Sequence, residues 1–98
     1  MRTARRPPAP VANTTRQFIE AEIALGLTFV RLAHTEYRYG ETALGRTVKA
    51  KAAQASAEAE YRLNQAEARG VTMRDLRARL GQLLAALARF DEDERKAA

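Results

Sequence analysis

Three ionisable side chains lie on or at the edge of the apolar face of a predicted helix, and they are the first candidates for chemistry. Glu22 and Glu36 are fourteen residues apart, a separation of roughly 21 Å along a helix. Two carboxylates that act together lie closer, within about 10 Å in a glycosidase. His34 is the one histidine of the chain, whereas a di-iron bundle needs a Glu-x-x-His pair on each of two helices. We therefore predict no metal ion and no cofactor.

Two interpretations of the glutamates stay open. In the first, Glu22 is a ligand or an acid buried in a helical core. In the second, it forms an ion pair with a neighbouring helix or points outwards at the seam of a dimer, because buried acids are usually paired. A salt bridge from Glu22 to Arg62 is the specific form of the second interpretation, and Arg62→Leu is then expected to raise the pKa of Glu22.

Other catalytic motifs are missing from the sequence. It contains no cysteine, so a disulfide, a thiolate metal site and a cysteine nucleophile are excluded. It also contains neither a glycine-rich phosphate loop nor a Gly-x-Ser-x-Gly elbow. We therefore expect that the protein is not an enzyme, and we assign no catalytic residue.

The stretch 17–37 is predicted to be the helix around which the rest of the chain packs. Its apolar residues fall on two adjacent flanks of a helical wheel, namely Phe18, Leu25, Phe29 and Leu32 on one and Ile19, Ile23, Gly26, Val30 and Tyr37 on the other. Together they cover about half of the circumference, more than the roughly 100° stripe of an ordinary surface helix. We therefore expect this helix to be sandwiched between at least two packing partners.

Three helices are predicted, at about 14–39, 42–69 and 72–90. Gly40 and Gly70 follow the first two, and glycine suits the left-handed conformation with which many helices end. The links are short, so successive helices must run antiparallel. The predicted fold class is all-α, an antiparallel three-helix up-down bundle with long helices.

The two ends of the chain are predicted to lie outside the bundle of residues 14–90. Residues 1–13 hold all three prolines and three arginines, and we expect a disordered basic arm, because proline lacks an amide donor and favours extended geometry. Residues 91–98 begin with several acids, which lie at the unfavourable end of the helix dipole. We expect a charged, frayed tail there.

The second predicted helix is rich in alanine and shows two apolar stripes. One stripe suits the core, and the other contains Ala50, Ala57 and Tyr61 on a different side. This second stripe is spare within the bundle, so we predict that it supports self-association as a homodimer. If residues whose numbers sum to about 81 lie opposite each other, Gly26 packs against Ala55, where two small residues permit a close approach of the helices.

The third predicted helix combines an apolar seam with a basic surface. The seam residues alternate three and four apart, as in a packed bundle, and are Met73, Leu76, Leu80, Leu83, Leu87 and Phe90. Gly81 interrupts this helix, and we predict that another backbone approaches it closely, near Tyr61. Arg74 and Arg77 either form an ordinary solvated face or contact the phosphate backbone of a nucleic acid.

Composition narrows the class of protein further. The net charge is +5 over 98 residues, which weakly favours acidic partners. No run of about 18 uncharged apolar residues occurs, so we expect no membrane span. A cysteine-free chain is compatible with a reducing compartment, and we expect a cytoplasmic location.

Two short motifs carry a resemblance to a known family. Leu25-Gly26-x-x-Phe29 and the spacing of Ala43, Thr47 and Ala50 resemble the two helices of a tetratricopeptide repeat, with threonine in place of an aromatic residue. The closing proline and a second copy of the repeat are missing. The outline is also similar to helical hairpins of the microtubule-interacting-and-transport type. The resemblance implies binding of a peptide or protein.

The sequence therefore predicts a non-enzymatic helical module for protein–protein interaction or dimerisation, with an unknown protein as a further partner. The alternative is a basic accessory protein associated with nucleic acid. The candidate binding residues are Tyr61, Ala50, Ala57, Arg74 and Arg77.

Overall fold

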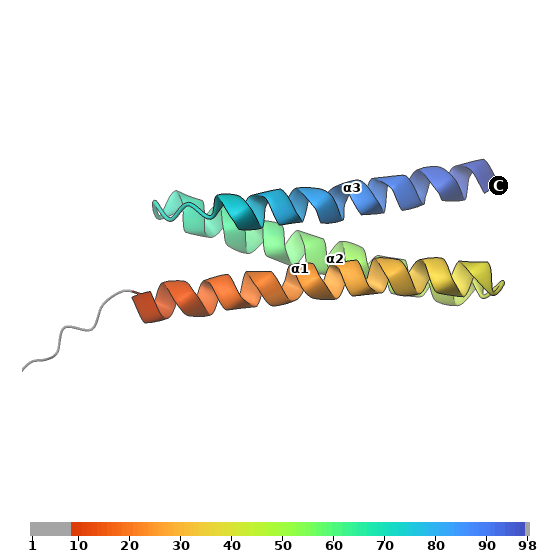
Figure 1. Cartoon of the computed structure of the whole chain (residues 1–98), viewed down its shortest axis with the longest axis horizontal. Coiled ribbons are helices and arrows are strands. Elements are labelled where there is room, and N and C mark those ends of the chain that lie inside the picture. The colour runs from red at the N-terminus through yellow and green to blue at the C-terminus, as the bar shows by residue number, and fades with distance from the viewer. Residues whose placement is uncertain (1–8, 98) are drawn as a thin grey trace, which may run out of the picture.

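The computed structural model describes residues 9–97 and shows three helices joined by two short turns (Figure 1). They are α1 (Ala9–Arg38), α2 (Thr42–Ala68) and α3 (Arg74–Ala97). Each helix runs antiparallel to the one before it, and α1 packs against both of the others (Figure 1). The predicted all-α, three-helix bundle is confirmed.

Two glycines shape the turns, as predicted. Gly40 and Gly70 have φ angles of +83° and +87°, a left-handed conformation that glycine adopts without steric cost. After the first turn the amide of Glu41 donates to the carbonyl of Glu36 at 2.8 Å, and after the second the amide of Val71 donates to the carbonyl of Ala66 at 2.9 Å. These bonds satisfy carbonyls that the helix ends leave unpaired.

The outer ends of the helices differ from the predicted bounds. Of the predicted arm, residues 1–8 lie outside the described part of the chain, and residues 9–13 belong to α1. The first turn tolerates Pro10, because an amide there has no partner within the helix. At the other end α3 continues to Ala97, so residues 91–97 are helical where we predicted a frayed tail.

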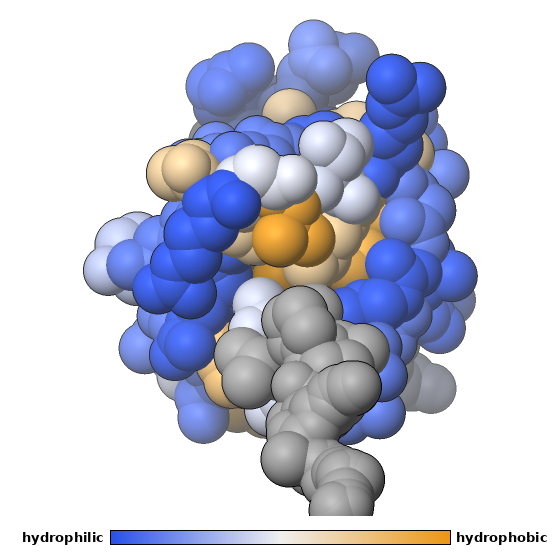
Figure 2. Space-filling view, turned by 90° about the vertical axis from the view of Figure 1, so that its left-hand side faces the viewer, coloured by the Kyte–Doolittle hydropathy of each residue, from blue (hydrophilic) through white to orange (hydrophobic). Residues whose placement is uncertain are grey.

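The core lies along the line where the three helices meet. Ile19 and Ile23 of α1, Leu63 of α2, and Leu76 and Leu80 of α3 are almost completely buried. Seen from the end where α1 begins, a small apolar patch lies near the middle of the surface and hydrophilic residues surround it (Figure 2). The predicted sandwich around α1 is therefore made within one chain, by α2 and α3.

Three glycines inside helices have three different surroundings. A Cβ atom added to Gly26 would lie 2.6 Å from Cδ2 of Leu83, and one added to Gly45 would lie 2.8 Å from the ring of Tyr37. Gly26 therefore leaves room for the side chain of Leu83 on α3. The predicted packing of Gly26 against Ala55 of α2 stays a prediction. Gly81 has nothing within 4 Å of its added Cβ, so the predicted close approach at that glycine is wrong.

The register of α1 against α2 follows the predicted pairing to within one residue. The guanidinium of Arg62 lies over the ring of Phe18, 4.4 Å from its centroid, and Gly45 lies beside Tyr37. This register fixes which side chains of the two helices lie at the same level along the bundle.

Candidate functional site

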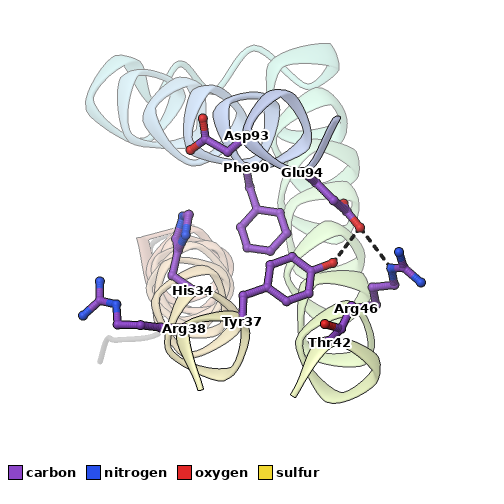
Figure 3. A pocket seen from close by; sticks show the side chains of 8 residues that line it. All are labelled: His34, Tyr37, Arg38, Thr42, Arg46, Phe90, Asp93 and Glu94. Carbon is purple, nitrogen blue, oxygen red and sulfur yellow. Dashed lines mark hydrogen bonds and ion pairs between the residues drawn. The ribbon is translucent and has the colours of Figure 1, made fainter. Parts of the chain in front are cut away.

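Two hollows lie on the described surface, and each is lined by both polar and apolar side chains. The first lies where α1 ends, α2 begins and α3 ends (Figure 3). It measures about 570 Å³ and is lined by His34, Tyr37, Arg38, Thr42, Arg46, Phe90, Asp93 and Glu94. We call it the end hollow.

Aromatic packing and a shared carboxylate hold the end hollow together. Phe90 is 1 % exposed, with ring centroids 4.7 Å from His34 and 5.1 Å from Tyr37. The Tyr37 hydroxyl donates to Oε2 of Glu94 at 2.6 Å, and Nε of Arg46 donates to the same oxygen at 3.0 Å (Figure 3). One turn earlier on α3, Asp91 is ion-paired with Lys49 of α2. These contacts explain why the acidic end of α3 is helical.

The ionisation states in the end hollow suit a structural contact between the three helices rather than proton transfer. The pKa of the Glu94 carboxyl is lowered by the hydrogen bonds from Tyr37 and Arg46. The pKa of Tyr37 is raised by its partial burial and by the bond to Glu94. At neutral pH Glu94 is therefore ionised and Tyr37 keeps its proton as a donor. Among residues with described side chains, no three His, Cys, Asp or Glu lie where they could hold a metal ion together.

The second hollow is a groove of about 420 Å³ between α1 and α2. Its lining residues are Phe18, Glu22, Leu25 and Phe29 from α1 and Lys51, Gln54, Ala55 and Glu58 from α2. Leu25 is 45 % exposed, and Leu32, one heptad further along α1, is 41 % exposed. The groove therefore combines apolar side chains, mostly from α1, with charged and polar side chains, mostly from α2, and no residue of α3 lines it.

The groove follows a continuous seam on α1, which we call the outer seam. Its residues alternate four and three apart, the spacing of a helix that packs in a coiled coil, and are Phe18, Glu22, Leu25, Phe29, Leu32 and Glu36. An inner seam runs one residue further on, through Ile19, Ile23, Gly26, Val30, Ala33 and Tyr37. The inner seam lies against α2 and α3, whereas the outer seam is only partly covered.

The charges in the groove are not arranged as predicted. Arg62 pairs with Glu58 on its own helix, with Nε 3.1 Å from Oε2, and the predicted salt bridge from Glu22 to Arg62 is not formed. The described contacts give Glu22, Glu36 and Lys51 no ion-pair partner. Two carboxylates and one ammonium group therefore border an apolar strip without neutralising each other.

The predicted binding residues on α2 lie away from the groove. Ala50, Ala57 and Tyr61 are exposed together on the side of α2 opposite its buried residues. Tyr61 is 56 % exposed, and its hydroxyl accepts a hydrogen bond from Nε2 of Gln65 at 2.9 Å. We did not predict Lys51 and Gln54 as groove residues from the sequence. Their positions on the second helix, combined with the outer seam of the first, could have indicated that they line the groove.

The two predicted arginines of α3 differ in their contacts. Arg74 is exposed, while Arg77 donates to Oδ1 of Asn64 at 2.9 Å and to Oε1 of Glu67 at 2.8 Å. Arg77 therefore joins α3 to α2. Among the other basic groups nearby, Arg16 of α1 is ion-paired with Asp75 of α3.

Comparisons with known proteins do not identify a family for this chain. Neither a protein-family model, nor a curated protein, nor a solved structure matches the chain. Within the described residues no helix has the length and apolar character needed to cross a bilayer.

Proposed function

We propose that this chain is a non-enzymatic protein–protein interaction module and that its binding surface is the groove between α1 and α2. The observation that carries the proposal is the partial exposure of Leu25 and Leu32 on a seam shared with Phe18 and Phe29. Apolar side chains at this spacing suit the apolar face of a partner helix, which supplies side chains every three and four residues.

The shape of the surface supports a helix as the ligand. From Phe18 to Leu32 the strip extends over fourteen residues, or roughly 21 Å at the helical rise. Small molecules bind mostly in concave pockets that bury nearly all of their surface. A strip of this length offers a helix more contact area than it offers a compact molecule. A cytoplasmic location, with which the cysteine-free sequence is compatible, belongs to the same proposal.

The alternative function, association with nucleic acid, would depend on the basic surface of α3. Arg77 is engaged by Asn64 and Glu67, and Arg16 by Asp75. These contacts leave fewer cations for phosphates than the sequence suggests. We therefore place this alternative second.

A thiol reporter tests the groove directly, because the chain has no cysteine. Gln54→Cys places one thiol in the groove, and Ala85→Cys places a control thiol on the exposed side of α3. Maleimide labelling rates would be compared in dilute purified protein and in an extract of the producing cells. We expect the extract to slow labelling at position 54 relative to position 85.

Adding Leu25→Asp to the Gln54→Cys variant should restore the fast rate, because a charge in the outer seam opposes an apolar partner. Circular dichroism would verify that each variant is folded. Labelling at position 54 that is as fast as in the Leu25→Asp variant, both with and without extract, would rule out the groove as the binding surface.

A further inference from the structure

We propose that the partner in the groove is a second copy of this chain, paired antiparallel about a two-fold axis that passes beside Leu27. The inference rests on the proposed function, because it uses the same groove, and it names the partner. In this dimer α1 lies along α1 of the other copy, and the two outer seams face each other. Three observations carry it: the seam register, the unpaired charges and the exposed leucines.

The seam register selects one antiparallel alignment. With the axis beside Leu27, Leu25 faces the partner's Phe29, and Glu22 faces the partner's Leu32. Phe18 likewise faces the partner's Glu36. All six outer-seam residues then oppose outer-seam residues, whereas a shift by one heptad leaves two of them facing residues outside the seam.

The hairpin register places Lys51 at the level of Phe29, because both lie eleven residues from the contacting pair of Arg62 and Phe18. Glu22 of the same chain is seven residues from that level, or roughly 10 Å along the axis. In the dimer the partner's Glu22 lies at the level of Leu32. Leu32 is three residues from Phe29, or about 4.5 Å along the axis. The long side chain of Lys51 can therefore reach the carboxylate of the partner's Glu22.

The second seam glutamate also meets a cation. In the dimer the partner's Glu36 lies at the level of Phe18, over whose ring Arg62 lies. Arg62 is already paired with Glu58 through Nε, and its remaining N–H donors can meet the partner's Glu36. Each copy thus offers Lys51 and Arg62 to the two seam glutamates of the other copy, and the symmetry doubles both contacts. A parallel pairing, with the axis along the helices, would instead place Glu22 at the level of the partner's Glu58 and bring like charges together.

The exposed leucines complete the argument. Leu44 is 47 % exposed and lies at the level of Glu36, so the partner's Phe18 would cover it. Leu25 and Leu32 are covered by the outer seam of the other copy. The apolar residues then supply the area that is removed from water, and the glutamates fix the register, as polar residues in coiled-coil seams do.

Exchange of charges tests the dimer. Molar mass would be measured by light scattering and sedimentation equilibrium over a range of concentrations, for a chain of 10.9 kDa. We expect twice that mass for the natural chain. Glu22→Lys and Lys51→Glu should each weaken association by about tenfold or more. The double variant with both changes should associate nearly as well as the natural chain, because the pairs form again between the copies.

Glu60→Lys is the matched control, since Glu60 is exposed on α2 and does not line the groove; its dimer should be unchanged. Three outcomes would overturn the proposal. A monomer at every concentration, with position 54 still protected in extract, would mean that another protein occupies the groove, and the proposed function would stand. A monomer with no protection would end both proposals. Two weakened single variants without recovery in the double variant would overturn the register.

Discussion

Two glycines in the middle of helices give a direct test of how closely α1 and α3 pack. An added Cβ at Gly81 meets nothing within 4 Å, whereas one at Gly26 lies 2.6 Å from Cδ2 and 3.2 Å from Cδ1 of Leu83. Replacing each glycine by alanine makes the same chemical change in these two surroundings. The difference between the two variants therefore reports the contact with Leu83.

The surroundings of each glycine indicate how much its replacement by alanine changes the free energy of unfolding. Alanine is favoured over glycine inside a helix by about 1 kcal/mol, and at Gly81 nothing opposes this gain. In a chain of this length the gain corresponds to a rise of roughly 4–8 °C in the melting temperature. At Gly26 the same gain is opposed, because Leu83 is completely buried and overpacking costs about 1–3 kcal/mol. Gly26→Ala should therefore lie between no change and a loss of about 2 kcal/mol.

Urea unfolding followed by circular dichroism measures both free energies. All samples should have the same protein concentration, because association would add a concentration-dependent contribution. Leu83→Ala introduced into each variant completes a double-mutant cycle. With Leu83 shortened, Gly26→Ala should become stabilising by about 1 kcal/mol, while the effect of Gly81→Ala should not change. If Gly26→Ala stabilises the natural chain as much as Gly81→Ala does, the close approach of α1 to α3 is refuted.

Two further predictions concern the end hollow. The pKa of Glu94 is lowered by hydrogen bonds from Tyr37 and Arg46, so its stabilising contribution is present above the ordinary value of 4.5 and is lost as the pH falls through the folded-state pKa. Glu94→Gln should therefore be less stable than the natural chain at neutral pH and nearly equal to it in acid, as urea midpoints across pH would show; a constant difference would contradict this. Phe90→Ala should cost about 3–5 kcal/mol, because the ring is buried between His34 and Tyr37; a measured loss under about 1 kcal/mol would show that the cluster is loosely packed.

Features encoded by neighbouring residues were predictable from the sequence. Gly40 and Gly70 end their helices through their own backbone conformation, and the leucines of α3 repeat at a spacing that only a helix places on one face. The end of α3 was not predictable in this way. Its acids are unfavourable by the local rule of the helix dipole, and they are stabilised by Lys49 and Arg46, which are more than forty residues away in the chain.

The candidate site was predictable only in part. The excess apolar surface of α1 is visible in the sequence, but the helix that covers each flank is not. Gly26 and Gly81 look alike in sequence, yet one admits Leu83 and the other faces open space. Likewise, the sequence predicts Glu22 as the partner of Arg62, whereas the carboxylate paired with it is Glu58 on its own helix. Such choices depend on tertiary geometry, which local patterns do not contain.

The composition of the two seams explains why α3 covers the inner one. The α3 seam consists of leucines, methionine and phenylalanine, without a cation to meet a carboxylate. Placing it over Glu22 and Glu36 would bury two charges without partners, at a cost of several kcal/mol. The inner seam carries no charge, and Gly26 gives Leu83 room to enter. The glutamates thus direct α3 away from the outer seam, and under our proposal the same two carboxylates attract the surface that presents Lys51 and Arg62 beside an apolar strip.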